Sequence, residues 1–175
     1  ERTLRCFDID RTDAVLIGPG LGDRKYSWPV NSDIMLGFKG LLVLDADALN
    51  CLAFLPEGWR WLKGRKGPTW ITPHAGEFQR LFPEVNSSNQ LEAAVEAAKL
   101  RGAVVLLKGA HSVVADPSGA SWQLCETVQW VARAGLGDLM AGYCGGLGSL
   151  GIAANQLCDG EHLAAAMFLH AEACR

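Results

Sequence analysis

Four short apolar runs, without the polar alternation of a half-exposed strand, constrain the fold of this chain most strongly. They cover residues 14–17, 41–44, 70–72 and 103–107. A strand with one face in water alternates apolar and polar residues, whereas a strand of a parallel sheet is buried on both faces and is continuously apolar. The runs therefore predict neighbouring strands of a mostly parallel sheet that is covered on both sides.

The segments between these runs carry helix signals. The clearest helix is predicted over residues 91–101. Asn89 and Glu92 have the spacing of a capping box before it, and Gly102 follows at the position where many helices end in the left-handed conformation. Strands that alternate with helices predict an α/β fold of three layers, with the sheet in the middle.

The last third of the chain departs from this alternation. Residues 116–119 read Asp-Pro-Ser-Gly, a turn sequence between the candidate strands 112–115 and 121–125, which predicts an antiparallel hairpin at one edge of the sheet. Two helices rich in small residues are expected over 138–150 and 160–173. We expect all of these elements to belong to one domain.

Composition excludes several classes of protein. The chain has 175 residues and is 49% hydrophobic, enough for the core of one domain. A formal net charge of −3 argues against nucleic acid as a partner, and no apolar stretch approaches the roughly 20 residues of a membrane span. The densest basic cluster, Lys63, Arg65 and Lys66, is expected in a solvated loop.

The six cysteines stand far apart and form no C-x-x-C pair, which fits neither a zinc site nor a compact disulfide framework. Most have apolar or small neighbours, so buried free thiols in a reducing cytoplasm are expected. They are Cys6, Cys51, Cys125, Cys144, Cys158 and Cys174.

Polar clusters follow all four apolar runs. They cover residues 18–22, 45–50, 72–77 and 108–112. The carboxyl ends of parallel strands meet at one edge of an open α/β sheet, and ligands bind at that edge. Convergence of four clusters is stronger evidence for a ligand site than any one of them.

The most informative polar segment is Gly135-Leu136-Gly137-Asp138, which precedes a predicted helix. Two glycines at a helix start leave backbone N–H groups free to bind phosphate at the positive end of the helix dipole. Asp138 could then take a proton from a hydroxyl held beside that phosphate. The segment favours phosphoryl chemistry on a small alcohol, and the alternative is that its glycines serve only tight helix packing.

Two other glycine- and aspartate-rich segments allow more than one interpretation. Residues 18–22 read Gly-Pro-Gly-Leu-Gly, but Asp23 stands where a dinucleotide fingerprint would continue, so Gly22 is interpreted as a point of close ligand approach or part of a plain turn. Asp45 and Asp47 could hold a hydroxyl-rich ligand or hydrated Mg²⁺, or Asp47 could cap the following helix.

The histidines and Lys108 also leave alternatives. His74 and Glu77 are three residues apart and would share a helix face, either as a ligand-binding histidine with its orienting carboxylate or as a surface pair. Lys108 could meet a phosphate as a point charge or be an ordinary strand-end lysine. His162 and His170 are interpreted as structural.

Taken in this order, the motifs resemble those of the ADP- or ATP-dependent NAD(P)H-hydrate dehydratases, a branch of the ribokinase-like superfamily. The resemblance covers about residues 14–150. It rests on G-P-G-L-G at 18–22, D-A-D-A-L-N at 45–50, T-P-H-A-G-E at 72–77, K-G at 108–109 and G-L-G-D at 135–138.

The resemblance implies a ribokinase-like fold and the repair of damaged nicotinamide cofactor. The substrate would be hydrated NADH or NADPH, which carries a hydroxyl on the nicotinamide ring. ADP or ATP, with Mg²⁺, would phosphorylate that hydroxyl, and phosphate would then leave to restore NAD(P)H. The resemblance also implies a cytoplasmic homo-oligomer without a membrane or nucleic-acid partner, fused in some members to an epimerase domain.

By the same resemblance, Asp138 is the base that activates the hydroxyl, and no side chain is assigned to a metal. The substrate would contact Gly22, Thr72, Pro73, His74, Ala75, Gly76, Glu77, Phe78 and Asp138. The nucleotide would contact Lys108, Gly109, Ala110, His111, Ser112, Arg133, Ala134, Gly135, Leu136 and Gly137.

The chain departs from the family in extent. Family members carry further sheet before the first glycine-rich motif and more helix after the last residues seen here. We therefore expect residues 1–175 to form a single dehydratase domain that is truncated on its N-terminal side and incomplete at both ends. Two other functions stay open: a kinase of the same superfamily acting on a vitamin-like alcohol, and a nucleotide-binding fragment without turnover.

Overall fold

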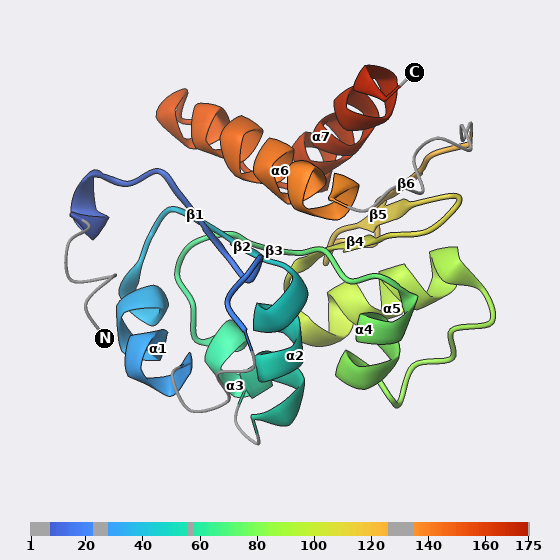
Figure 1. Ribbon diagram of the computed structural model, residues 1–175, viewed down its shortest axis with the longest axis horizontal. Coiled ribbons are helices and arrows are strands. Elements are labelled where there is room, and N and C mark those ends of the chain that lie inside the picture. Colours follow the sequence, from blue (N-terminus) through green and yellow to red (C-terminus); the bar gives the residue numbers. More distant parts are fainter. Residues whose placement is uncertain (1–7, 23–27, 56–57, 126–134, 175) are drawn as a thin grey trace.

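The computed structural model describes residues 8–22, 28–55, 58–125 and 135–174. Its centre is a six-stranded sheet in which the strands lie in chain order (Figure 1). The first four are mutually parallel and the last two form an antiparallel hairpin. The strands are β1 (Ala14–Ile17), β2 (Leu41–Leu44), β3 (Thr69–Ile71), β4 (Val104–Leu107), β5 (Val113–Ala115) and β6 (Ser121–Gln123). All six predicted strands are confirmed, with ends that differ by two residues at most.

The chain-order arrangement of the parallel strands decides where the helices lie. Crossovers between parallel strands are right-handed in nearly all proteins, so successive crossovers in one direction place their helices on the same face. The helices between β1 and β4 accordingly lie together below the sheet in Figure 1, and the two helices after β6 cover the opposite face. The three predicted layers are confirmed.

The helices that lie between β1 and β4 in the chain are α1 (Trp28–Gly37), α2 (Ala46–Phe54), α3 (Gly58–Lys63), α4 (Ala75–Leu81) and α5 (Gln90–Arg101). The opposite face carries α6 (Leu136–Ala153) and α7 (Gly160–Ala173), and a short 3-10 turn, η2 (Ile9–Arg11), precedes β1. The predicted helix 91–101 is confirmed: the Asn89 side chain accepts hydrogen bonds from two N–H groups of the first turn, and Gly102 is left-handed with φ 68°.

Burial on both faces explains why the strands lack polar alternation. In β2, Leu42 and Leu44 belong to the core cluster beneath the sheet, whereas Leu41 and Val43 belong to the cluster under α6 and α7. Successive side chains of a strand point to opposite faces, so both sets of positions must be apolar when helices cover both sides.

Helix α6 starts earlier than expected and packs tightly on the sheet. It begins at Leu136, two residues before the predicted start, because Gly135 has φ 88° and directs the chain into the helix. A Cβ atom at Gly148 would lie 2.0 Å from the Leu41 side chain, so this glycine serves close packing. Added Cβ atoms at Gly135 and Gly137 would make no such close contact with the described residues. The packing explanation therefore does not extend to the G-L-G-D corner.

Arg65 corrects the expectation of a solvated basic loop. Its guanidinium is partly buried and donates hydrogen bonds to the carbonyl oxygens of Gly40 (3.0 Å) and Met35 and to Thr69 Oγ1 (2.8 Å). Burial lowers the pKa of Arg65 to about 10. The connections at this end of the sheet leave carbonyl groups without sheet partners, and buried carbonyl groups need donors. Lys63 and Lys66 are exposed, as predicted.

The cysteines divide by environment. Cys51, Cys144 and Cys158 are buried free thiols, as expected for most of the cysteines, whereas Cys125 is exposed and Cys174 is half-buried. Cys6 lies outside the described residues. No helix in the described part of the chain is long and apolar enough to span a membrane.

Candidate functional site

The carboxyl ends of the four parallel strands meet at one edge of the sheet, as the polar clusters predict. The register of the sheet continues past the strand ends, since the Asp45 N–H donates to the Ile17 carbonyl oxygen (3.0 Å) and the Thr72 N–H to the Leu44 carbonyl oxygen (3.1 Å). Gly18 lies so close to Asp45 that an added Cβ would be 1.6 Å from the Asp45 carbonyl oxygen. Only glycine fits there, which explains the first residue of the G-P-G-L-G motif.

Asp47 holds the glycine-rich loop in place. Its Oδ2 accepts a hydrogen bond from the Gly22 N–H (2.8 Å). The structure thus corrects the interpretation of Asp47 as a helix cap, because the residue that precedes α2 is Asp45. Gly22 is exposed, with φ 75° and no described atom within 4 Å of an added Cβ, so a ligand can approach its backbone closely.

Asp45 lies at the centre of a buried polar cluster. Its carboxylate is almost fully buried, and Oδ1 accepts hydrogen bonds from Thr72 Oγ1 and from Lys108 Nζ, each at 2.7 Å. A buried carboxylate is costly unless paired, and Lys108 supplies the opposite charge. These bonds occupy Asp45 and weaken its interpretation as a metal ligand.

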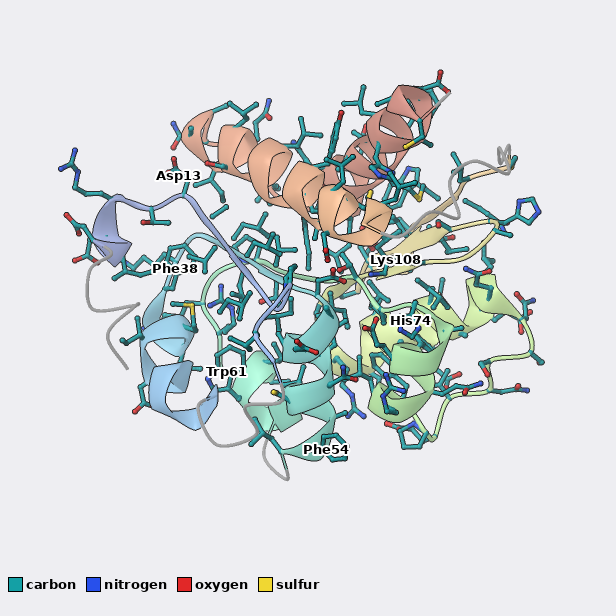
Figure 2. The ribbon with its side chains drawn as sticks, viewed as in Figure 1. Asp13, Phe38, Phe54, Trp61, His74 and Lys108 are labelled. Carbon is teal, nitrogen blue, oxygen red and sulfur yellow. The ribbon has the colours of Figure 1, made fainter. Side chains whose placement is uncertain are left out.

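Lys108 connects this cluster to helix α6. Its N–H donates to the Pro73 carbonyl oxygen (2.8 Å), and its backbone forms a parallel bridge with His74. Its Nζ lies 3.9 Å from the position of a Cβ at Gly137, in the first turn of α6. Figure 2 shows Lys108 where the sheet meets α6. The ammonium group is therefore placed for an anion at this helix start.

Burial raises the pKa of the Cys144 thiol, also on α6, to about 12.

His74 and Glu77 form the capping box of α4. His74 Nδ1 accepts hydrogen bonds from the N–H groups of Gly76 (3.0 Å) and Glu77 (3.4 Å), and Glu77 Oε2 accepts from the His74 N–H (2.9 Å). The predicted proximity of the pair is confirmed, although Glu77 is buried and serves the helix start. Because Nδ1 accepts, the network assigns the ring proton to Nε2, which already faces Glu77 Oε1 at 3.4 Å. The ring itself is exposed, so its face and edge are accessible to a ligand.

Burial narrows the predicted substrate segment. Thr72, Pro73, Glu77 and Phe78 are buried, so their side chains shape the edge from beneath. The residues of the segment that are accessible to a ligand are His74, Ala75 and Gly76.

The predicted nucleotide segment after β4 is an exposed turn closed by Ser112. The Gly109 N–H donates to Ser112 Oγ (3.2 Å), and Ser112 Oγ donates to the Gly109 carbonyl oxygen (3.0 Å). Ala110 and His111 are exposed, with His111 Nδ1 3.3 Å from the Leu124 carbonyl oxygen. The hydroxyl of Ser112 therefore stabilises the turn.

The first turn of α6 presents the G-L-G-D motif to solvent. Within the described residues, no side chain caps this helix start, and the Leu139 N–H is the one that donates to the Gly135 carbonyl oxygen (3.1 Å). The preceding N–H groups, from Leu136 to Asp138, are those that a helix leaves without intrahelical partners. Asp138 is exposed beside them. Among the described residues, these N–H groups and an accessible carboxylate thus lie together. Arg133 and Ala134 lie outside the described residues.

Sequence reasoning assigned no role to Arg80 and gave His170 only a structural one. Arg80 Nε donates to Asn50 Oδ1 (3.1 Å), and its Nη1 lies 3.8 Å from the position of a Cβ at Gly76, near the start of α4. His170 is buried on α7, with its ring 5.7 Å from that of Tyr143 on α6. The sequence signal that could have pointed to Arg80 is Asn50, its hydrogen-bond partner and the last residue of the D-A-D-A-L-N motif.

Solved structures first define the class of protein. A ribokinase-like superfamily protein from Enterococcus faecalis is 22% identical and aligns with a TM-score of 0.70, covering 94% of this chain and 55% of that one, which shows a shared fold. The ADP/ATP-dependent NAD(P)H-hydrate dehydratase from Bacillus subtilis, co-crystallised with ATP and Mg²⁺, is 30% identical with a TM-score of 0.73, covering 91% of this chain and 54% of that one.

Sequence comparison then shows the family. The chain matches the NAD(P)H-hydrate dehydratase family over residues 2–175 and belongs to it, as predicted. The bifunctional NAD(P)H-hydrate repair enzyme of Synechocystis is 42% identical over 144 residues, 81% of this chain and 26% of the relative. That of Gloeobacter violaceus is 42% identical over 140 residues, 80% of this chain and 27% of the relative. The chain thus spans about a quarter of the length of these curated relatives.

Proposed function

We propose that this chain provides the phosphoryl-transfer site of an enzyme that dehydrates hydrated NADH or NADPH, with ADP or ATP as the phosphoryl donor. The observation that carries the proposal is the uncapped first turn of α6, with Lys108 beside Gly137 and Asp138 exposed at its edge. Membership of the dehydratase family supports the choice of substrate.

The residues of this corner have distinct roles in the proposal. The N–H groups of Leu136 and Gly137 bind the phosphate that is transferred, and Lys108 adds a positive charge. Asp138 accepts the proton of the ring hydroxyl while the hydroxyl oxygen attacks phosphorus. AMP leaves when ADP is the donor, and ADP leaves when ATP is.

The second half of the reaction restores the cofactor. The carbon–oxygen bond of the phosphorylated ring breaks, inorganic phosphate leaves with the bonding electrons, and the neighbouring ring carbon loses a proton to form the double bond. Phosphate is a far better leaving group than hydroxide, which is the chemical reason for using a nucleotide. A carboxylate is a weak base at neutral pH, so the positions of Asp138 and the amides must supply most of the acceleration.

Mg²⁺ fits this corner as an ion carried by the nucleotide. Across the described residues, no group of three or more His, Cys, Asp or Glu side chains could hold a metal, and Asp45 and Asp47 are occupied by internal hydrogen bonds. Mg²⁺ often binds largely through substrate phosphates and water, which leaves Asp138 in its proposed role as the base. When bound, the ion would neutralise charge on the phosphates.

The exposed edge beside the capping box is the proposed place of the nicotinamide substrate. Gly22, His74, Ala75 and Gly76 are accessible there. The exposed ring of His74 and the open backbone at Gly22 give a flat ligand a surface to pack on and a backbone that it can approach closely. We also propose that the protein carries an epimerase domain elsewhere, since curated relatives are bifunctional and much longer. That it is a cytoplasmic homo-oligomer is proposed from the family resemblance alone.

Oxygen labelling tests the proposal. Hydrated NADH with ¹⁸O in its ring hydroxyl is incubated with the protein, ADP and Mg²⁺, while the absorbance of reduced nicotinamide is followed. The expected result is recovery of that absorbance with the label in inorganic phosphate. Label in water, or recovery without nucleotide, would refute phosphorylation. Phosphate transfer to another alcohol without recovery would indicate a kinase, and ADP binding without turnover a binding fragment.

A further inference from the structure

We propose that Asp45 is a positioning residue that, together with Thr72, holds the ammonium group of Lys108 at the phosphate-binding turn of α6. The inference rests on the proposed function, because it assigns a role within that site. Asp45 belongs to the cluster that sequence reasoning interpreted as a ligand for a hydroxyl-rich molecule or Mg²⁺. Its observed contacts give it a different task.

The three side chains come from successive strands and point to the same face of the sheet. Asp45, Thr72 and Lys108 are the first residues after β2, β3 and β4. Side chains two residues apart in a strand point to the same side, and each of the three stands two residues after a member of the core cluster under α6 and α7. Those members are Val43, Trp70 and Leu106.

The cluster also restrains Lys108 strongly. The Asp45 carboxylate is about 1% exposed, and both of its donors reach the same oxygen at 2.7 Å. Thr72 Oγ1 is buried, so the carboxylate cannot turn away from Lys108 without losing a second bond. A free lysine samples many rotamers, and fixing one for a ligand costs conformational entropy. Asp45 fixes that rotamer before the ligand arrives.

Two effects of Asp45 on phosphate binding oppose each other. Its negative charge repels an incoming phosphate and partly cancels the charge of Lys108. Its hydrogen bond keeps the Lys108 ammonium near Gly137, 3.9 Å from the position of a Cβ there. Removal of the Asp45 charge should therefore raise the affinity for phosphate if repulsion is the larger effect and lower it if positioning is. We infer that positioning is the larger effect.

A double-mutant cycle on ADP affinity tests this, with titration calorimetry in the presence of Mg²⁺. Asp45→Asn keeps the size of the side chain, and we expect it to weaken ADP binding about tenfold, as for the loss of a charge-assisted hydrogen bond. Lys108→Met should weaken binding in the parent protein and change it little in the Asp45→Asn background. Unchanged or tighter binding by Asp45→Asn, or losses that simply multiply, would overturn the proposal.

A second pair of variants leaves both charges in place. Thr72→Val removes the hydroxyl that fixes Asp45, and we expect about threefold weaker ADP binding. Thr69→Val is the matched control. Thr69 is buried at the start of β3, the strand that Thr72 follows, and its hydroxyl is hydrogen-bonded to Arg65 at the opposite end of the strand from Thr72. Equal ADP affinities of the two variants would contradict the role of Thr72.

Failure of the inference and failure of the proposed function can be told apart, because calorimetry needs no turnover. An Asp45→Asn variant that binds ADP normally, in a protein whose parent repairs hydrated NADH, overturns the positioning role alone. Weaker binding by that variant in a protein without repair activity supports the positioning role and refutes the proposed reaction. A parent protein that does not bind ADP overturns both.

Discussion

Replacing Gly148 by alanine should destabilise the protein, although alanine is the better helix former. Gly148 lies in α6 against the sheet, where an added Cβ would be 2.0 Å from Leu41 Cδ2 and 3.3 Å from the Trp70 ring. Both side chains are fully buried, so Leu41 can turn away from an added methyl group only by displacing its packed neighbours. The helix must therefore shift away from the sheet, which also displaces its first turn relative to Lys108.

The magnitude follows from two opposing contributions. Alanine is about 1 kcal/mol more favourable than glycine inside a helix, whereas overpacking a buried site costs about 1–3 kcal/mol. With two buried neighbours the cost falls in the upper part of that range, so Gly148→Ala should lose about 1–2 kcal/mol net. Gly146→Ala is the control in the same helix. Gly146 is exposed, and an added Cβ would meet none of the described atoms within 4 Å, so this variant should gain up to about 1 kcal/mol.

Urea denaturation monitored by circular dichroism measures both variants. The midpoints should move in opposite directions, with unfolding free energies that differ by about 1–3 kcal/mol and melting temperatures that differ by about 2–12 °C. If Gly148→Ala is as stable as Gly146→Ala, the close contact between α6 and β2 is wrong.

Two further predictions follow from burial. Burial raises the pKa of Cys144 to about 12, so this thiol should resist iodoacetamide at pH 8 in the folded protein, whereas exposed Cys125 should react. Mass spectrometry of the labelled peptides measures both reactions. Rapid labelling of Cys144 would contradict its burial. Burial lowers the pKa of His170 in the folded protein, so the free energy of unfolding should be greatest above the pKa of the unfolded state, about 6.5, and fall as the pH drops below it. His170→Asn should reduce this dependence of the unfolding free energy on pH. An unchanged dependence would exclude His170 as its cause.

The fold could be predicted largely because its strongest signals are local. Apolar runs predicted the buried strands, and the residues flanking α5 predicted its two ends. The start of α6 differed from the prediction because it depends on backbone conformation. Gly135 takes φ 88°, and sequence alone does not show which of the glycines near a helix start does so. The order of the parallel strands in the sheet could also have been predicted, because strands that follow one another in the chain are usually neighbours in the sheet.

The positions of the candidate site residues could be predicted only where the sequence signal is local. The polar strand ends and the G-L-G-D turn are local features, and they lie where expected. The bond between Asp45 and Lys108 joins residues 63 apart in the chain, so it depends on three strands meeting in register. The two-residue periodicity of the strands would have placed both side chains on the α6 face. The roles of Asp47 and Glu77 were harder to predict, because their carboxylates accept hydrogen bonds from backbone N–H groups that come near only in the folded loops.

The most direct test of the proposed chemistry is the Asp138→Asn variant, assayed with hydrated NADH, ADP and Mg²⁺. Asparagine keeps the size of the side chain but accepts no proton, and Asp138 is exposed, so the fold should be unaffected. The account predicts that turnover falls at least about a hundredfold, as expected for loss of a general base, while calorimetry shows ADP affinity within about threefold of the parent protein. A variant that restores reduced nicotinamide at nearly the parent rate would exclude Asp138 as the base and contradict the proposed mechanism.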